Sequence, residues 1–151
     1  MAHPDLAKLL EGLLLFAQQM IDKHGEFFPF GATIDMKGDM ALSAAHTDSE
    51  QPPSQECSDI LTDGFRIQAK EDKIRACGIC YDVRTIPPGQ TEKVDAICAR
   101  LEHNCGDAVD VFLPYRKGWI GQVEYGEIFA CRGTKIVFGD EQQTLNFPPK
   151  T

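Results

Sequence analysis

The sequence contains no run of lysine and arginine and no long apolar stretch. Its formal net charge is −8 and its pI about 4.9. A surface of that sign repels phosphate backbones and anionic lipid, which argues against nucleic-acid and membrane partners. The apolar run at 13–17 is too short to span a bilayer or to form a signal-peptide core. We therefore expect a cytoplasmic protein.

The usual motifs of catalysis and cofactor binding are also missing. No Gly-rich loop stands between a strand and a helix, so a phosphate-binding loop is not expected. The sequence shows no Ser/His/Asp or Cys/His spacing that is typical of a catalytic site, so it does not support a thiol nucleophile. We expect no cofactor and favour a non-enzymatic protein over an enzyme.

The length and composition are those of an ordinary globular domain. The chain has 151 residues, of which 42% are hydrophobic and 25% charged. Residues 1–75 carry 13 acidic and 7 basic side chains, whereas residues 76–151 carry 10 and 8. We expect one domain over residues 1–139, with an acidic first half, and a polar tail over 140–151.

Hydrophobic periodicity predicts two helices and several strands. The helices are expected at 5–24 and 53–70, and the strands at 33–36, 40–44, 74–83, 94–103, 108–116, 123–132 and 134–138. The first two strands flank a three-residue hairpin loop at 37–39, which sets Ile34 opposite Leu42 and Met36 opposite Met40. Gly64 weakens the second helix, and a close backbone approach would explain why it is tolerated.

This order predicts an α+β fold. Successive strands joined by short turns pair antiparallel, giving a sheet of about six strands with both helices on one face. The order α-β-β-α-β-β-β-β resembles the profilin-like and roadblock-type arrangement over its first six elements. The resemblance implies a fold and no function.

Six cysteines raise the question of metal or redox chemistry. Cys77 and Cys80 form a CxxC motif, but a strand would turn them to opposite faces, which favours buried free thiols. If Gly78 breaks the strand, Cys77, Cys80, His103 and Cys105 form an alternative Cys3His zinc site.

A second set of possible ligands or acid–base groups follows the first hairpin. His46, Asp48 and Glu50 alternate in a polar loop that contains two prolines. An ordinary solvated loop explains the same pattern.

The candidate binding residues come from the second half of the chain. Tyr115, Arg116, Lys117 and Trp119 form a cluster of the types that dominate binding hot spots, although Trp119 alternatively closes the core. Four arginines lie in or beside strands and either share a face that binds an anion or pair across strands: Arg84, Arg100, Arg116 and Arg132. We select Arg84, Tyr115, Arg116 and Trp119 as binding candidates.

Three functions remain open. The first is a non-enzymatic interaction or regulatory module, homodimeric through the first helix, whose apolar face Leu15 and Phe16 widen. The second is a small-molecule-binding domain or cryptic enzyme, with a pocket between sheet and helices lined by Arg84, Tyr81 or Tyr115. The third is an acidic antitoxin-like inhibitor of a basic partner.

Overall fold

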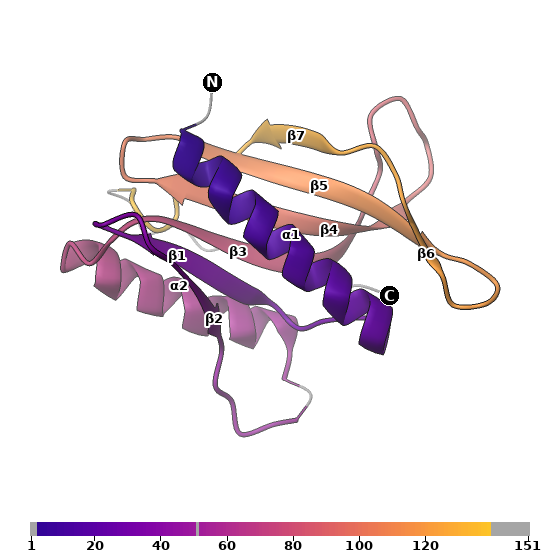
Figure 1. Ribbon diagram of the computed structural model, residues 1–151, viewed down its shortest axis with the longest axis horizontal. Coiled ribbons are helices and arrows are strands. Elements are labelled where there is room, and N and C mark those ends of the chain that lie inside the picture. Colours follow the sequence, from indigo (N-terminus) through magenta and orange to yellow (C-terminus); the bar gives the residue numbers. More distant parts are fainter. Residues whose placement is uncertain (1–2, 51, 140–151) are drawn as a thin grey trace.

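A seven-stranded antiparallel sheet with one helix on each face makes up the molecule (Figure 1). The computed structural model describes residues 3–50 and 52–139; the expected polar tail at 140–151 lies outside them. The elements follow in the order α1 (Pro4–His24), β1 (Phe30–Asp35), β2 (Met40–Ala44), α2 (Ser54–Lys70), β3 (Ile74–Thr85), β4 (Val94–His103), β5 (Ala108–Lys117), β6 (Val123–Tyr125) and β7 (Phe129–Arg132). No helix within the described ranges is long and apolar enough to cross a membrane.

The sheet has the strand order β2-β1-β3-β4-β5-β6, and β7 also pairs with β5. β2 therefore forms one edge, while β6 and β7 share the other. Every strand pairing within the described ranges is antiparallel. The predicted fold class, the element order and the antiparallel pairing are confirmed.

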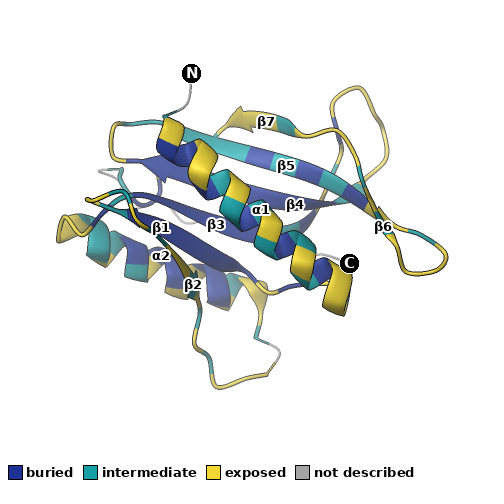
Figure 2. Ribbon diagram, viewed as in Figure 1, coloured by how far each residue is buried: buried dark blue, intermediate teal, exposed yellow. Residues whose placement is uncertain are grey.

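Helix α1 covers one face of the sheet through a stripe of buried residues, seen as dark blue in Figure 2. The stripe repeats at helical spacing: Leu6, Leu9, Leu13, Ala17 and Ile21. Gly25 ends the helix in the left-handed conformation, with φ of 78°, and donates its N–H to the carbonyl of Ile21. The helix lies close against β3, since a side chain on Gly78 would collide with Leu13.

Helix α2 covers the opposite face, so the prediction of both helices on one face is wrong. Alternate residues of β3 belong to separate cores: Cys80 packs with α1, whereas Ile79 and Tyr81 pack with Phe65 of α2. A strand that is apolar on both faces must be covered on both. The alternation in β3 was visible in the sequence, but small residues on its second face disguised that face's burial.

The first hairpin is shifted by two residues from its predicted register. Ile34 lies opposite Met40, and Ala32 opposite Leu42. Asp35 stabilises a longer turn, because its carboxylate accepts the backbone N–H groups of Lys37 and Asp39, each at 2.9 Å. A shift of two leaves each side chain on its predicted face.

Residues 134–138 form no strand, contrary to prediction. Their backbone turns instead toward Glu102, whose carboxylate accepts the N–H groups of Ile136, Val137 and Phe138. These amides satisfy their hydrogen-bonding requirement on a side chain rather than on a neighbouring strand.

Candidate functional site

The four predicted binding residues do not form one site. Tyr115 is buried on the α1 face, where its hydroxyl donates to Asp82 Oδ1 at 2.6 Å. Burial is the largest cause that raises the pKa of the Tyr115 hydroxyl. The hydrogen bond to Asp82 and the negative charge of Asp82 raise this pKa further. Tyr115 is thus a core residue that orients a carboxylate, and its side chain offers no recognition surface.

The strand arginines pair with carboxylates on neighbouring strands. Arg84 lies 3.6 Å from Asp95, and Arg100 lies 3.9 Å from Asp110. Exposed Arg116 donates to Glu124 at 2.8 Å. The first and second of these pairs lie on opposite faces of the sheet, as the strand register requires. The arginines therefore form no common anion-binding face, and the alternative of cross-strand pairing is confirmed for these three.

A polar cluster that sequence reasoning missed joins the start of α1 to the sheet. Asp5 accepts hydrogen bonds from Arg75, at 2.8 and 3.2 Å, and lies 2.8 Å from His103 Nε2. The ring of His3 stacks on that of His103 with centroids 3.7 Å apart. Only the fold brings these residues together, since Asp5 and His103 are 98 positions apart along the chain.

His3, Asp5 and His103 place ligand atoms close enough together to suggest a metal site. Each atom, however, already has a hydrogen-bonding role. His3 Nδ1 accepts the Asp5 N–H, and His103 Nδ1 accepts the Cys105 N–H. His103 Nε2–H is consequently the donor to Asp5 in the neutral ring. Because the two imidazole rings are stacked, their nitrogen lone pairs lie in nearly parallel planes. Such lone pairs do not converge on one ion in the tetrahedral geometry of a zinc site. The arrangement fastens α1 to the sheet.

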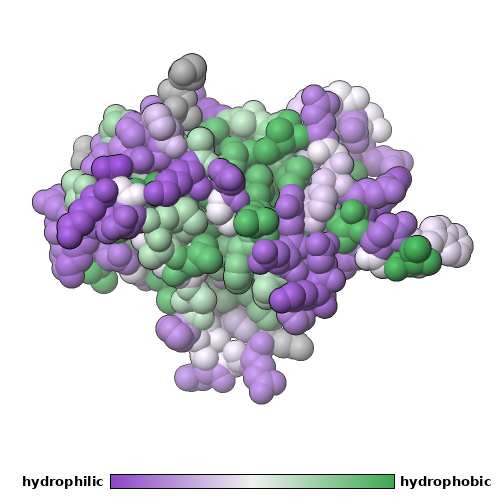
Figure 3. Space-filling model, viewed as in Figure 1, coloured by the Kyte–Doolittle hydropathy of each residue, from purple (hydrophilic) through white to green (hydrophobic). Residues whose placement is uncertain are grey.

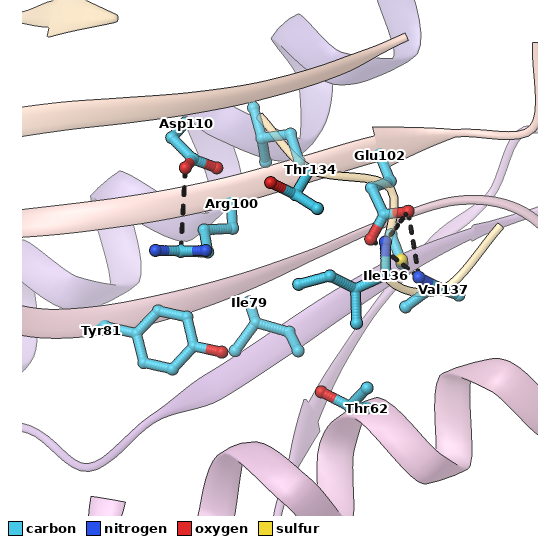
Figure 4. Close-up of a pocket in the computed structure, with 11 residues that line it drawn as sticks. Thr62, Ile79, Tyr81, Arg100, Glu102, Asp110, Thr134, Ile136 and Val137 are labelled. Carbon is cyan, nitrogen blue, oxygen red and sulfur yellow. Dashed lines mark hydrogen bonds and ion pairs between the residues drawn. The ribbon is translucent and has the colours of Figure 1, made fainter. Parts of the chain in front are cut away.

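The second polar cluster lies on the α2 face (Figure 4). Glu102 is buried beneath residues 136–138 and accepts their three successive amide groups. Burial raises the pKa of Glu102, although these amides oppose the shift. Burial likewise raises the pKa of Asp110 against the influence of Arg100. The carboxylate of Glu102 is thus bound by backbone amides, and that of Asp110 is paired with Arg100.

The cavity within this cluster has a volume of about 20 Å³. That is room for about one water molecule. Tyr81 lines it from β3, but Tyr115 lies on the other face of the sheet, so the predicted lining residues are not brought together. This cavity is too small for an organic substrate.

The CxxC cysteines are separated by the sheet, as the strand pattern predicted. Cys77 belongs to the α2-side core and Cys80 to the α1-side core. Burial raises the pKa of both thiols well above the ordinary value, so both resist forming thiolates. Cys105 is exposed, and His103 is engaged by Asp5. The alternative Cys3His zinc site is therefore wrong, because its ligands do not converge.

A hollow of about 380 Å³ opens beside the end of α1. Its lining includes four aromatic rings: Phe16, Phe27, Phe28 and Phe30. His46 and Glu50 from the polar loop also line it, whereas Asp48 does not belong to the lining. The structure thus places two of the three loop candidates beside an apolar depression.

The strongest surface feature is the turn between β5 and β6. Trp119 is fully exposed, at 103%, and Ile120 is 90% exposed. Figure 3 shows this loop projecting from the body of the molecule. The alternative that Trp119 closes the core is therefore wrong.

Local hydrogen bonds define the shape of this turn. The N–H of Gly118 donates to the carbonyl of Gln122 at 2.7 Å, and the N–H of Ile120 donates to Gln122 Oε1 at 3.2 Å. Gly121 has φ of 86°, a conformation that glycine adopts without steric penalty. At the base of the hairpin, the Lys117 ammonium lies near the C-terminal end of α1, where a β-carbon on Gly25 would be 3.1 Å from Nζ. Trp119 and Ile120 therefore project from a turn whose backbone is held by its own hydrogen bonds.

Comparisons with known proteins give no relative. No protein-family model matches the chain, no curated protein matches its sequence, and no solved structure matches its fold.

Proposed function

We propose that this protein is a non-enzymatic interaction module that binds a protein partner through the β5–β6 hairpin. We call Trp119 and Ile120 the hairpin tip. The full exposure of Trp119 on a structured turn carries the proposal. Tryptophan is among the residues most enriched at binding hot spots.

The energetics of the hairpin tip favour occupation by a partner. Burying an isoleucine side chain contributes about 1.5–3 kcal/mol, and a tryptophan has a larger surface. A turn already held by its own hydrogen bonds loses little conformational freedom on binding, so more of that contribution remains as affinity.

Charge favours a protein partner over a lipid surface. The chain carries a net charge of −8 and is repelled by anionic membranes. Beside the hairpin tip, the guanidinium of Arg116 already pairs with Glu124. Apolar contact with a pocket on another protein is the interaction that these groups support.

A cytosolic setting fits this proposal. All six cysteines are free thiols, which is the form expected in a reducing compartment. Four of the six are buried, where they contribute to packing.

Affinity purification of the full chain from its source cells tests the proposal. We expect a partner that is recovered with the wild type and lost with Trp119→Ala or Ile120→Ala. Ile86→Ala is the matched control, because Ile86 is also an exposed loop isoleucine and lies outside the hairpin. Recovery of the same proteins with Trp119→Ala would contradict the proposed role. Flotation with phosphatidylserine vesicles that depends on Trp119 would indicate a membrane target and also contradict it.

The aromatic hollow supports a second candidate function, binding of a small apolar molecule. Its volume of about 380 Å³ lies within the range of small-molecule sites, and aromatic side chains are typical of their walls. A fragment screen by ligand-observed NMR tests this candidate. Binding that is lost in Phe28→Ala but kept in Ile86→Ala is expected, and the absence of any hit that depends on Phe28 would exclude it.

A further inference from the structure

The edge strand β2 is unusually unprotected. Within the described ranges it pairs with β1 alone, and its five residues, Met-Ala-Leu-Ser-Ala, include no charge and no proline. Leu42, at its centre, is 51% exposed. Edge strands usually carry lysine, proline or a bulge that prevents pairing with another chain. Ala41 and Ala44 are exposed as well, whereas Met40 and Ser43 are half-buried.

An apolar stripe on α2 lies on the same side of the molecule. Ile60 and Ile67 are exposed, the latter at 58%, and Gly64 lies between them at helical spacing. The opposite side of α2 is directed toward β3 and the later chain, because Ser58 bonds to Tyr81. The stripe therefore lies on the side of α2 turned away from Tyr81, on a helix that contacts β2 as well as β1 and β3.

Within the described ranges, no neighbour explains a glycine at position 64. A β-carbon added at this position would have no heavy atom within 4 Å, so the described residues do not make the close backbone approach expected from the sequence. Glycine in a helix destabilises it by about 1 kcal/mol relative to alanine. A helix from a second molecule, packed against the stripe, would supply the missing approach.

We infer that β2 and α2 form a symmetric interface with a second copy of this chain. β2 pairs antiparallel with its counterpart about Leu42, which joins the two seven-stranded sheets into one. On the α2 face, the two α2 helices cross the two-fold axis with Gly64 at their closest approach. Strand and helix thus contribute to one interface.

A second copy is the occupant because the surface is self-complementary, as a two-fold interface requires. Antiparallel pairing about Leu42 sets Met40 opposite Ala44 and Leu42 opposite itself, without any like-charge pair. This matters because each copy carries a net charge of −8. Antiparallel α2 helices also bring the Glu56 end of one toward the Lys70 end of the other.

This interface differs from the one expected on α1. The broad apolar face of α1 is used within the chain, where its stripe packs on the sheet. The interface is also separate from the hairpin tip, because β2 and β6 lie at opposite edges of the sheet (Figure 1). A dimer joined at β2 therefore presents two hairpin tips and binds a multivalent target with increased avidity.

A cysteine at the two-fold axis tests the inference directly. Leu42→Cys is made with the exposed Cys105 and Cys131 replaced by serine. Directly opposite residues of an antiparallel pair have Cα atoms about 4.5–5.5 Å apart, within the range of a disulfide. Mild oxidation should give a species of twice 16.8 kDa that reduction reverses. Absence of this species, with an accessible free thiol at position 42, would overturn the inference.

Sedimentation equilibrium supplies the second readout. The wild type should be a dimer, and Leu42→Lys should raise its dissociation constant about tenfold or more, because two lysines then face each other. Ile86→Lys, which places the same charge at a residue of similar exposure, should leave the dimer intact. Gly64→Gln should weaken the dimer while raising the thermal stability of the monomer, which separates interface loss from misfolding.

Trp119→Ala distinguishes this interface from the proposed partner site. It should leave the dimer unchanged even where it abolishes partner recovery. A monomeric wild type, or a dimer that persists in Leu42→Lys but dissociates in Trp119→Ala, would overturn the inference and leave the partner-binding proposal to its own test.

Discussion

Tyr115 and Tyr125 lie opposite each other on β5 and β6, yet their hydroxyl groups differ in environment. Tyr115 donates to Asp82, whereas the buried hydroxyl of Tyr125 has no hydrogen-bond partner among the described residues. Tyr115→Phe should lower the free energy of unfolding by about 1–2 kcal/mol, while Tyr125→Phe should leave it unchanged or raise it. Urea unfolding of both variants checks the difference. Equal losses would show that the two hydroxyls are equivalent.

The cluster around Asp5 makes a prediction with a defined pH sign. Burial raises the pKa of Asp5, but hydrogen bonds from Arg75 and His103 outweigh it and leave this pKa below the ordinary 3.8. A depressed pKa stabilises the folded state fully above pH 3.8 and loses that contribution as the pH falls through the folded value.

Asp5→Asn should therefore lower the free energy of unfolding by about 1.5–3 kcal/mol at pH 6. The difference between wild type and variant should shrink at pH 3, because the contribution is lost as the pH falls from 3.8 toward the lowered pKa of Asp5 in the folded state. Urea unfolding at the two pH values measures it. A difference of the same size at both would mean that the ionised form of Asp5 does not matter.

Residue-level predictions from the sequence succeeded where the physics is local. The alternation of side chains along a strand placed Cys77 and Cys80 on opposite faces, and the structure confirms it. The Asp5 cluster could not be predicted, because its members meet only through tertiary contacts. For Trp119, the sequence identified the residue but not its exposure, which depends on whether the turn folds back onto the core.

At the scale of elements, residues 134–138 depend on one carboxylate. Burial raises the pKa of Glu102 above the ordinary 4.5, and the amides of residues 136–138 only partly oppose this shift. For an acid with a raised folded pKa, the folded state binds the extra proton. The contribution to stability therefore decreases as the pH rises from about 4.5 through the folded value.

Glu102→Gln removes this titration. The unfolding free energy of the wild type, minus that of the variant, should fall between pH 4.5 and pH 7. Urea unfolding across this range measures the change, and hydrogen exchange at residues 136–138 reports whether the segment stays in place. A difference that grows with pH would contradict the assigned cause.

The elements themselves were largely predictable, and their placement was not. Helix α1 follows from its apolar spacing and terminal Gly25, and the 94–103 strand has the bounds that alternation predicts. Whether α1 and α2 cover the same face of the sheet or opposite faces depends on whether both faces of β3 are buried. The small residues on one face of β3 do not reveal in the sequence that this face is buried. The segment 134–138 has strand-like composition, but Glu102 competes for its amides.

At the scale of the whole molecule, the salt dependence of partner affinity distinguishes recognition by charge from recognition by apolar contact. The proposed contact through the hairpin tip is apolar, so partner affinity should change little between 50 and 500 mM salt. An acidic inhibitor of a basic partner would instead lose affinity steeply. Calorimetric titration of the recovered partner at several salt concentrations separates the two. A steep loss would favour charge recognition by the acidic first half.

Contact at position 119 tests the central claim most directly. A photo-crosslinking amino acid is placed there in the full chain within the source cells, and at Gln90 on the exposed loop before β4 as the control. We predict one dominant crosslinked protein from position 119 and none from position 90. Crosslinking from position 119 that does not exceed that from position 90 would contradict the claim that the hairpin tip binds a partner.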